Sequence, residues 1–141
     1  MEKYRILPHT ADGKFRAFGA TIEEAFAHAA LALASLMWDW RKVESGESIE
    51  IEVRGRDREQ LLSKFLEEVI VAFEVRRFLL ASVEGLTIDE AAGSLRLRAV
   101  FSGGGLQPDT ELLCDVKAVT YHEMKIENNG CGWSVQVVVD M

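Results

Sequence analysis

Apolar residues recur at three- and four-residue spacing in two segments of the chain, and this period predicts two amphipathic helices. The first begins after Thr21, whose hydroxyl can accept from the Glu24 amide while the Glu24 side chain returns the bond, and it ends near Trp38. The second begins after Asp57, which has a glutamine three residues further on, and continues to about Arg77. We expect the second helix to lie at the centre of the core.

Alternating apolar and polar residues predict strands in most of the remaining chain. Residues 48–54 alternate strictly, which is typical of a strand with one face in water. The other expected strands are 4–7, 15–18, 82–89, 95–101, 116–126 and 133–139. Together these elements predict an α+β fold, in which residues 1–141 form a single domain with two main helices packed on antiparallel β-sheet.

The composition is that of a globular protein, with 48% hydrophobic and 28% charged residues in 141. A domain of this size hides roughly two-thirds of its unfolded surface. Lysine and arginine total 16 against 23 acidic residues, a net charge of −7, so we expect no strong direct binding of nucleic acid.

The N-terminus lacks an apolar signal segment, and no stretch approaches the ~20 apolar residues that span a bilayer. We therefore expect a cytoplasmic protein with no membrane partner.

Neither the glycine-rich segment nor the two cysteines indicates a functional site. Residues 102–105, Ser-Gly-Gly-Gly, precede Pro108 and predict a flexible surface loop. These glycines do not end in Gly-Lys-Ser/Thr or open a helix, so they lack the features of a phosphate cradle. Cys114 and Cys131 form no C-x-x-C pair, and we expect two buried or half-buried thiols without a disulfide.

Candidate ligand groups stand at both ends of the chain. Asp12 lies in an expected turn, and Asp140 directly precedes the terminal carboxylate of Met141. If folding brings Asp12 beside the other two, three carboxylates converge, and like charges persist together only around a cation or bound basic groups. The alternative, which the spacing leaves open, is a turn former and an exposed terminal residue.

Imidazoles could extend this set. His9 and His122 could join Asp12 and Asp140 in a transition-metal site, because imidazole with carboxylate suits zinc, manganese or iron. A hydrogen-bonding role for both histidines is the simpler alternative. Lys117 begins an apolar strand, and its functional interpretation is a counter-charge to the carboxylates.

The chain resembles the archease family along essentially its whole length. The most specific segments are His-Thr-Ala-Asp at 9–12, Lys-Ala-Val-Thr-Tyr-His at 117–122 and the final Val-Asp-Met. Thr-x-x-Glu-Ala-Phe at 21–26 and Phe-Leu-Glu-Glu at 65–68 also match. The chain departs from the family pattern at three positions: Pro8 replaces a common acidic residue, Met141 a terminal isoleucine, and Thr110 a frequent histidine.

The resemblance implies a cytosolic accessory protein that stimulates the RtcB-type RNA ligase of tRNA splicing. Such a protein promotes GTP-dependent guanylylation of the ligase and multiple turnover. It is not an enzyme itself and has no catalytic residues. The resemblance also implies a divalent cation, typically calcium, held by Asp12, Asp140 and the terminal carboxylate of Met141. We refer to these three groups as the acidic cluster.

The same resemblance places Lys117 in the functional cluster that meets the ligase, and we add His9 and His122 to it. Two other functions stay open. One is a metal-dependent hydrolase that uses Asp12, Asp140, His9 and His122 around a metal-bound hydroxide. The other is a module that presents tRNA or proteins to RNA-modifying enzymes, against which the acidic net charge argues. Other tRNA-modifying enzymes are also candidate partners.

Overall fold

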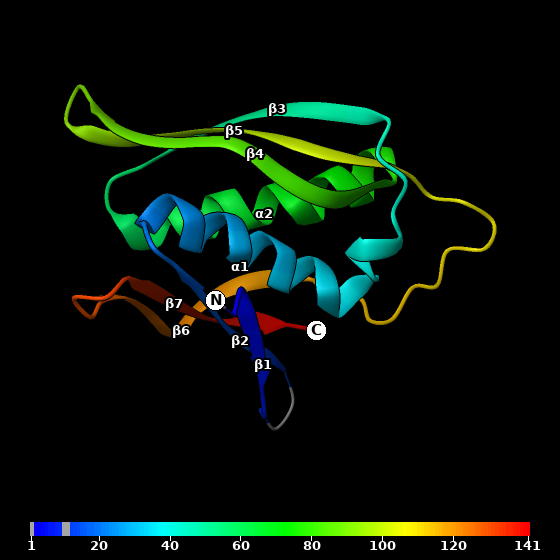
Figure 1. The fold of residues 1–141 in the computed structure, drawn as a ribbon, viewed down its shortest axis with the longest axis horizontal. Helices are drawn as coiled ribbons and strands as arrows, with labels where there is room; N and C mark the ends of the chain where they lie inside the picture. The colour runs from blue at the N-terminus through cyan, green and yellow to red at the C-terminus, as the bar shows by residue number, and fades with distance from the viewer. Residues whose placement is uncertain (1, 10–11) are drawn as a thin grey trace.

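In a computed structural model of the chain, two α-helices lie between two antiparallel sheets (Figure 1). The structure describes residues 2–9 and 12–141. The helices are α1 (Ile22–Met37) and α2 (Arg58–Arg76), with a 3-10 turn, η1 (Trp40–Lys42). The strands are β1 (Tyr4–Leu7), β2 (Gly13–Gly19), β3 (Glu47–Gly55), β4 (Phe78–Ala91), β5 (Ser94–Gly105), β6 (Ala118–Asn128) and β7 (Trp133–Asp140). The predicted α+β class is confirmed, and the sheet is divided into two layers.

The first sheet has the strand order β1-β2-β7-β6, and the second has the order β3-β5-β4. All neighbouring strands are antiparallel. The first sheet therefore joins both ends of the chain, because β1 and β2 pair next to β7. The second sheet is built from the middle of the sequence and covers the opposite side of the helices (Figure 1).

Local capping signals position both helices as predicted. Thr21 accepts from the Glu24 amide at 3.1 Å, and the Glu24 carboxylate accepts from the Ala20 amide, one residue before the cap. Asp57 accepts from the Gln60 amide at 2.8 Å at the start of α2. These bonds satisfy amides that have no partner within the helix.

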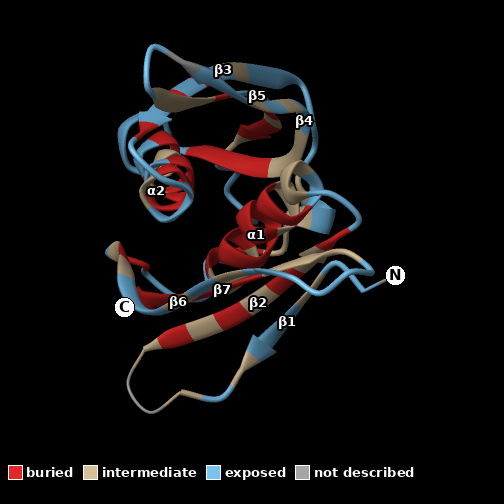
Figure 2. Ribbon diagram, turned by 90° about the vertical axis from the view of Figure 1, so that its left-hand side faces the viewer, coloured by how far each residue is buried: buried red, intermediate tan, exposed pale blue. Residues whose placement is uncertain are grey.

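The core lies on both sides of the helix pair, because each helix is covered by both sheets (Figure 2). Phe65 on α2 joins the layers: its ring stacks on Phe26 of α1 at 6.5 Å and tilts against Phe101 of β5 at 5.7 Å. All three rings are fully buried. The second helix lies in the core as predicted, and it shares the central position with α1.

The expectation of a flexible loop at 102–105 is wrong, because these residues form the last part of β5. A Cβ atom at Gly103 would collide with the Leu79 carbonyl oxygen, and one at Gly104 would collide with the Glu44 carbonyl oxygen. The glycines therefore allow close backbone packing beside a strand. β4 also begins at Phe78, ahead of the expected start at residue 82.

The prediction of buried thiols is also wrong. Cys114 and Cys131 are both free and exposed.

Neither α-helix in the described residues is long and apolar enough to cross a membrane.

Candidate functional site

The two ends of the chain meet at one end of the first sheet. Gly13 lies opposite Val139 in the β2–β7 register, so Asp12 and Asp140 are the residues that come next on the two strands. A Cβ atom added at Gly13 would lie 3.2 Å from Met141 Sδ, which places the last residue beside β2. The backbone therefore brings Asp12, Asp140 and Met141 to the same end of the first sheet. The ligand role of their carboxylates stays a prediction.

Lys117 adjoins the same end of the sheet. Its amide donates to the Asp140 carbonyl at 2.8 Å, directly before β6 begins at Ala118. Its side chain is exposed, and its ammonium forms no ion pair with another described residue. A functional role for this lysine stays a prediction.

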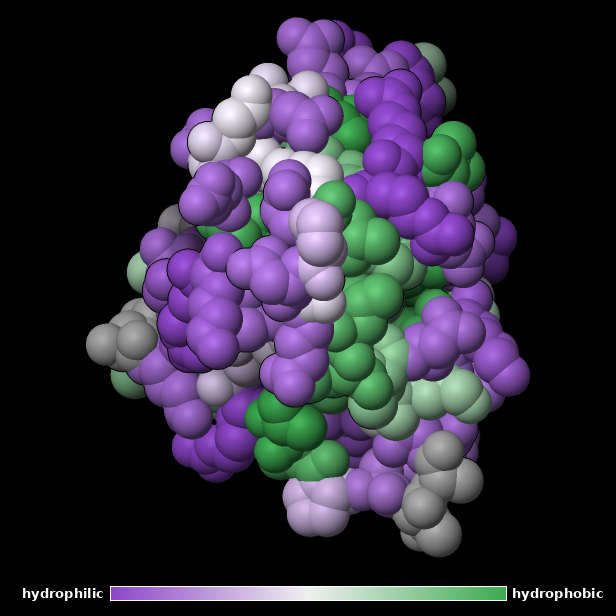
Figure 3. All heavy atoms as spheres, turned by 90° about the vertical axis from the view of Figure 1, so that its right-hand side faces the viewer, coloured by the Kyte–Doolittle hydropathy of each residue, from purple (hydrophilic) through white to green (hydrophobic). Residues whose placement is uncertain are grey.

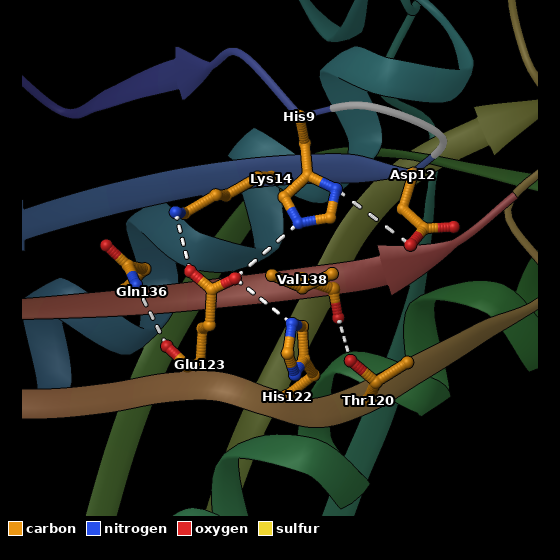
Figure 4. A network of polar contacts seen from close by, with 8 residues as sticks. All are labelled: His9, Asp12, Lys14, Thr120, His122, Glu123, Gln136 and Val138. Carbon is orange, nitrogen blue, oxygen red and sulfur yellow. Dashed lines mark hydrogen bonds and ion pairs between the residues drawn. The ribbon is translucent and has the colours of Figure 1, made fainter.

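His9 and His122, which the sequence separates by more than a hundred positions, come together in the structure (Figure 4). Their ring centroids are 6.3 Å apart, with the planes nearly perpendicular. The ring of His9, between β1 and β2, reaches toward β6, which carries His122. The two imidazoles therefore meet as the transition-metal hypothesis required, although their common neighbour is a glutamate that the hypothesis omitted.

That neighbour is Glu123, which forms with His9 and His122 what we call the histidine cluster. Glu123 Oε2 lies 3.1 Å from His122 Nε2 and 3.6 Å from His9 Nε2. Lys14 Nζ lies 3.0 Å from the other oxygen, Oε1. The hydrogen bond and the charge of Lys14 lower the pKa of the Glu123 carboxyl, with smaller contributions from His122 and His9.

An irregularity in β6 turns the Glu123 side chain across β7 toward β2. The β6–β7 register shifts between Thr120 and Lys125, and Glu123 has a left-handed backbone with φ 54°. Bulges of this kind redirect side chains. Gln136 of β7 fixes the segment, because its amide donates to the Glu123 carbonyl at 2.9 Å while its oxygen accepts from Arg16 at 2.7 Å.

The ring of His9 is held on its other side by a longer contact. His9 Nδ1 is buried and has no hydrogen-bond partner among the described residues. The nearest charged group is Asp12 Oδ2 at 3.9 Å. A buried polar atom without a partner is costly, so Asp12 is the group placed to satisfy this nitrogen.

Lys14 and Glu123 were not among the residues predicted from the sequence. Lys14 looks like an ordinary polar position of an alternating strand, and its pairing with Glu123 depends on contacts across the sheet. A local signal existed for Glu123: residues 121–123, Tyr-His-Glu, interrupt the alternation of the strand. Such an interruption is typical of a bulge.

The site thus offers two donor sets of different chemistry. The acidic cluster consists of carboxylate oxygens, which are the ligands that calcium prefers, so these residues fit the cation expected from the resemblance. The histidine cluster combines two imidazoles and one carboxylate. The fold and site together define a class of small α+β protein in which β7 pairs with the β1–β2 hairpin and carboxylate side chains lie at the sheet end where they meet.

Comparison with known proteins identifies the family. The model of the Archease protein family matches residues 4–141. Protein archease of Methanosarcina mazei is 37% identical over 141 residues, covering 99% of this chain and 97% of that protein. Protein archease of Thermococcus kodakarensis is 39% identical over 143 residues, covering 100% of both. The chain belongs to the archease family, as its sequence segments indicated.

Solved structures agree with this assignment. The solution structure of Methanobacterium thermoautotrophicum protein 1598 matches with a TM-score of 0.86 and 30% identity, covering 100% of both chains. A crystal structure from Thermotoga maritima, described as an archease and possible chaperone, matches with a TM-score of 0.61. Its identity is 20%, over 96% of this chain and 94% of that one, so it supports the fold alone.

Proposed function

We propose that this chain activates the RtcB-type RNA ligase of tRNA splicing, promoting GTP-dependent guanylylation of the ligase and repeated turnover without catalysing a reaction itself. The observation that carries the proposal is the match to the archease family across residues 4–141. The segments behind that resemblance contain Asp12, Lys117 and Asp140, which lie at one end of the first sheet.

The acidic cluster is the centre of the proposed activity. Asp12 and Asp140 hold a divalent cation together with the carboxylate of Met141, and calcium is the cation that the resemblance implies. Asp140 is exposed, so a cation at this sheet end lies within reach of a partner. When bound, the cation supplies positive charge that neutralises phosphate oxygens during guanylyl transfer. Lys117, exposed beside Asp140, contributes a further positive charge toward the same phosphates.

An apolar surface beside the acidic cluster supports a protein partner. Leu112 and Leu113 are exposed in the segment between β5 and β6, and the Leu113 amide donates to the Met37 carbonyl at the end of α1. Met141 is 36% exposed near the same end of α1, beside Leu36. The face of the molecule on this side carries an apolar band among polar side chains (Figure 3). Exposed apolar areas rimmed by polar residues are typical of protein interaction sites.

The test is multiple-turnover RNA ligation by the cognate ligase with GTP and a divalent metal. Wild-type protein should raise the number of turnovers per ligase, and Asp12→Asn or Asp140→Asn should abolish this effect. Glu74→Gln, an exposed carboxylate on α2 outside the site, is the matched control and should stimulate like the wild type. Circular dichroism verifies that all three variants are folded.

Two results would overturn the proposal. The first is full stimulation by both aspartate variants, which would remove the acidic cluster from the activity. The second is the absence of stimulation by the folded wild type with its cognate ligase. Loss of ligase guanylylation in the aspartate variants, measured with labelled GTP, would assign the effect to the nucleotide-transfer step.

A further inference from the structure

We propose that the histidine cluster, formed by His9, His122 and Glu123, is a second metal site that binds zinc or a similar borderline transition metal. Its ligands are imidazole nitrogens and one carboxylate oxygen, unlike the oxygen donors of the acidic cluster. The inference goes beyond the activation of a ligase and does not depend on it.

The geometry of the three side chains is close to that of a bound ion. Each residue offers one ligand atom, and these atoms all lie within 4.8 Å of one another. Ligand atoms around tetrahedral zinc are roughly 3.4 Å apart, given bond lengths of about 2.0–2.1 Å. The separations of 3.1 Å and 3.6 Å from Glu123 Oε2 to the two imidazoles bracket this value. Only the distance between His9 and His122 has to shorten, and the His122 ring, which would move, is exposed.

The groups behind the ligands have the arrangement of an outer shell. Metal-bound histidines commonly donate their second ring N–H to a carboxylate, which fixes the tautomer. Asp12 Oδ2 lies 3.9 Å from the buried, unpartnered Nδ1 of His9. A proton on Nδ1 shared with Asp12 leaves the lone pair on Nε2, the nitrogen that faces Glu123.

Lys14 completes this arrangement on the carboxylate. Its ammonium donates a hydrogen bond to Glu123 Oε1 at 3.0 Å, and Oε2 is the oxygen that both histidines face. Glu123 would therefore bind the ion through a single oxygen. Lys14 also offsets part of the negative charge of Glu123, so the site selects its cation by ligand type more than by net charge.

The donor set determines which cations fit. Two imidazoles and one carboxylate suit zinc, iron or copper, whereas calcium and magnesium prefer oxygen ligands. Three protein ligands leave a fourth position open for water or for a group of a partner. Asp12 lies between the two clusters, so it would act as an outer-shell partner here and as a ligand in the acidic cluster.

The test measures Zn²⁺ binding to the full chain by calorimetry in the presence of excess Ca²⁺, which competes for sites made of oxygen ligands alone. We expect one equivalent of Zn²⁺ to bind. Glu123→Gln and His122→Ala should each weaken zinc binding by at least about tenfold, and Asp12→Asn should weaken it by about ten- to a hundredfold. Glu74→Gln, which changes an exposed carboxylate on α2 outside both clusters, should leave zinc binding unchanged.

Imidazole nitrogen NMR provides the second readout. Zinc should shift the Nε2 resonances of His9 and His122 and leave those of His28 unchanged; the Nδ1 of His28 lies 2.6 Å from the Phe18 carbonyl, away from the cluster. Unchanged His9 and His122 resonances, full displacement of Zn²⁺ by Ca²⁺, or wild-type zinc affinity in Glu123→Gln would each overturn the proposal. None of these measurements uses the ligase, so failure of this inference is distinguishable from failure of the proposed function.

Discussion

Lys14 Nζ lies 3.0 Å from Glu123 Oε1, although the two residues are 109 positions apart in the sequence. Lys14 belongs to β2 and Glu123 to β6, with β7 between them in the sheet. The contact exists because the β6 irregularity at Glu123 turns this side chain across β7. One ion pair thus connects the N-terminal hairpin to the C-terminal one and fixes the carboxylate of the histidine cluster.

The first prediction concerns the charge state of Glu123 in the metal-free protein. Lys14→Met should raise the pKa of the Glu123 carboxyl toward its ordinary value, because Lys14 is the principal cause of the lowered pKa. A lowered folded-state pKa stabilises the fold above the pKa of the unfolded chain, and that stability is lost as pH falls through the folded pKa. The variant should therefore lose less stability on acidification than the wild type.

Carboxyl-carbon NMR over an acidic pH series measures the Glu123 pKa directly. Lys42→Met, which removes an exposed lysine on η1, is the matched control and should leave the Glu123 titration unchanged. An identical Glu123 titration in Lys14→Met and wild type would show that the ion pair is absent in solution.

The second prediction tests the glycine run of β5. Gly103→Ala should destabilise the fold by about 1–3 kcal/mol, the range for overpacking, because its Cβ would collide with the Leu79 carbonyl oxygen. Gly46→Ala is the control: no heavy atom lies within 4 Å of a Cβ there, so its effect should stay within about 0.5 kcal/mol. Urea unfolding measures both variants. Equal stability of the two variants would contradict the close approach at Gly103.

Much of the fold could be predicted because its signals are local. The bonds of Thr21 and Asp57 at the two helix starts depend on residues only three positions away. The glycines of β5 were wrongly predicted to form a loop. They are required by a non-local contact, because the backbone at Leu79 and Glu44 approaches them closely. Composition alone cannot distinguish a glycine needed for close packing from one in a flexible turn.

The candidate site was predictable to a similar extent. The sequence indicated His9 and His122 by residue type, but their meeting requires the β1–β2 connection to reach β6. Glu123 was missed because its direction is set by a backbone irregularity, which hydrophobic periodicity does not encode. The adjacency of Asp12 and Asp140 follows from one strand pairing, β2 with β7. The sequence could suggest this adjacency because each aspartate lies at the end of a predicted strand.

The third prediction concerns the aromatic contact between the layers. Phe65→Ala should cost about 3–5 kcal/mol, the usual range for removing a buried ring, because the side chain contacts both Phe26 and Phe101. Val75→Ala lies on the same helix but at a position that is 75% exposed, and it should change stability by less than about 0.5 kcal/mol. Urea unfolding separates the two. A small loss in Phe65→Ala would mean that the layers pack through other contacts.

The last prediction tests the apolar surface between β5 and β6 as the contact with the ligase. Leu112→Ser and Leu113→Ser remove exposed side chains and leave the backbone bond from Leu113 to Met37 in place. Stability should therefore change by less than about 0.5 kcal/mol. Half-maximal stimulation of the ligase should require at least about fivefold more protein, because truncating an interface anchor costs more than about 1 kcal/mol of binding.

Titration of each variant against a fixed ligase concentration separates binding from activity. A surface role predicts a higher half-maximal concentration with unchanged maximal stimulation, since the acidic cluster is intact in both variants. Val75→Ser, an exposed apolar residue on α2, is the control for lost surface hydrophobicity and should leave the curve unchanged. An equal shift in Val75→Ser, or none in either leucine variant, would place the ligase contact on another face. A lowered maximum would instead show that these leucines act in the activation step after the complex has formed.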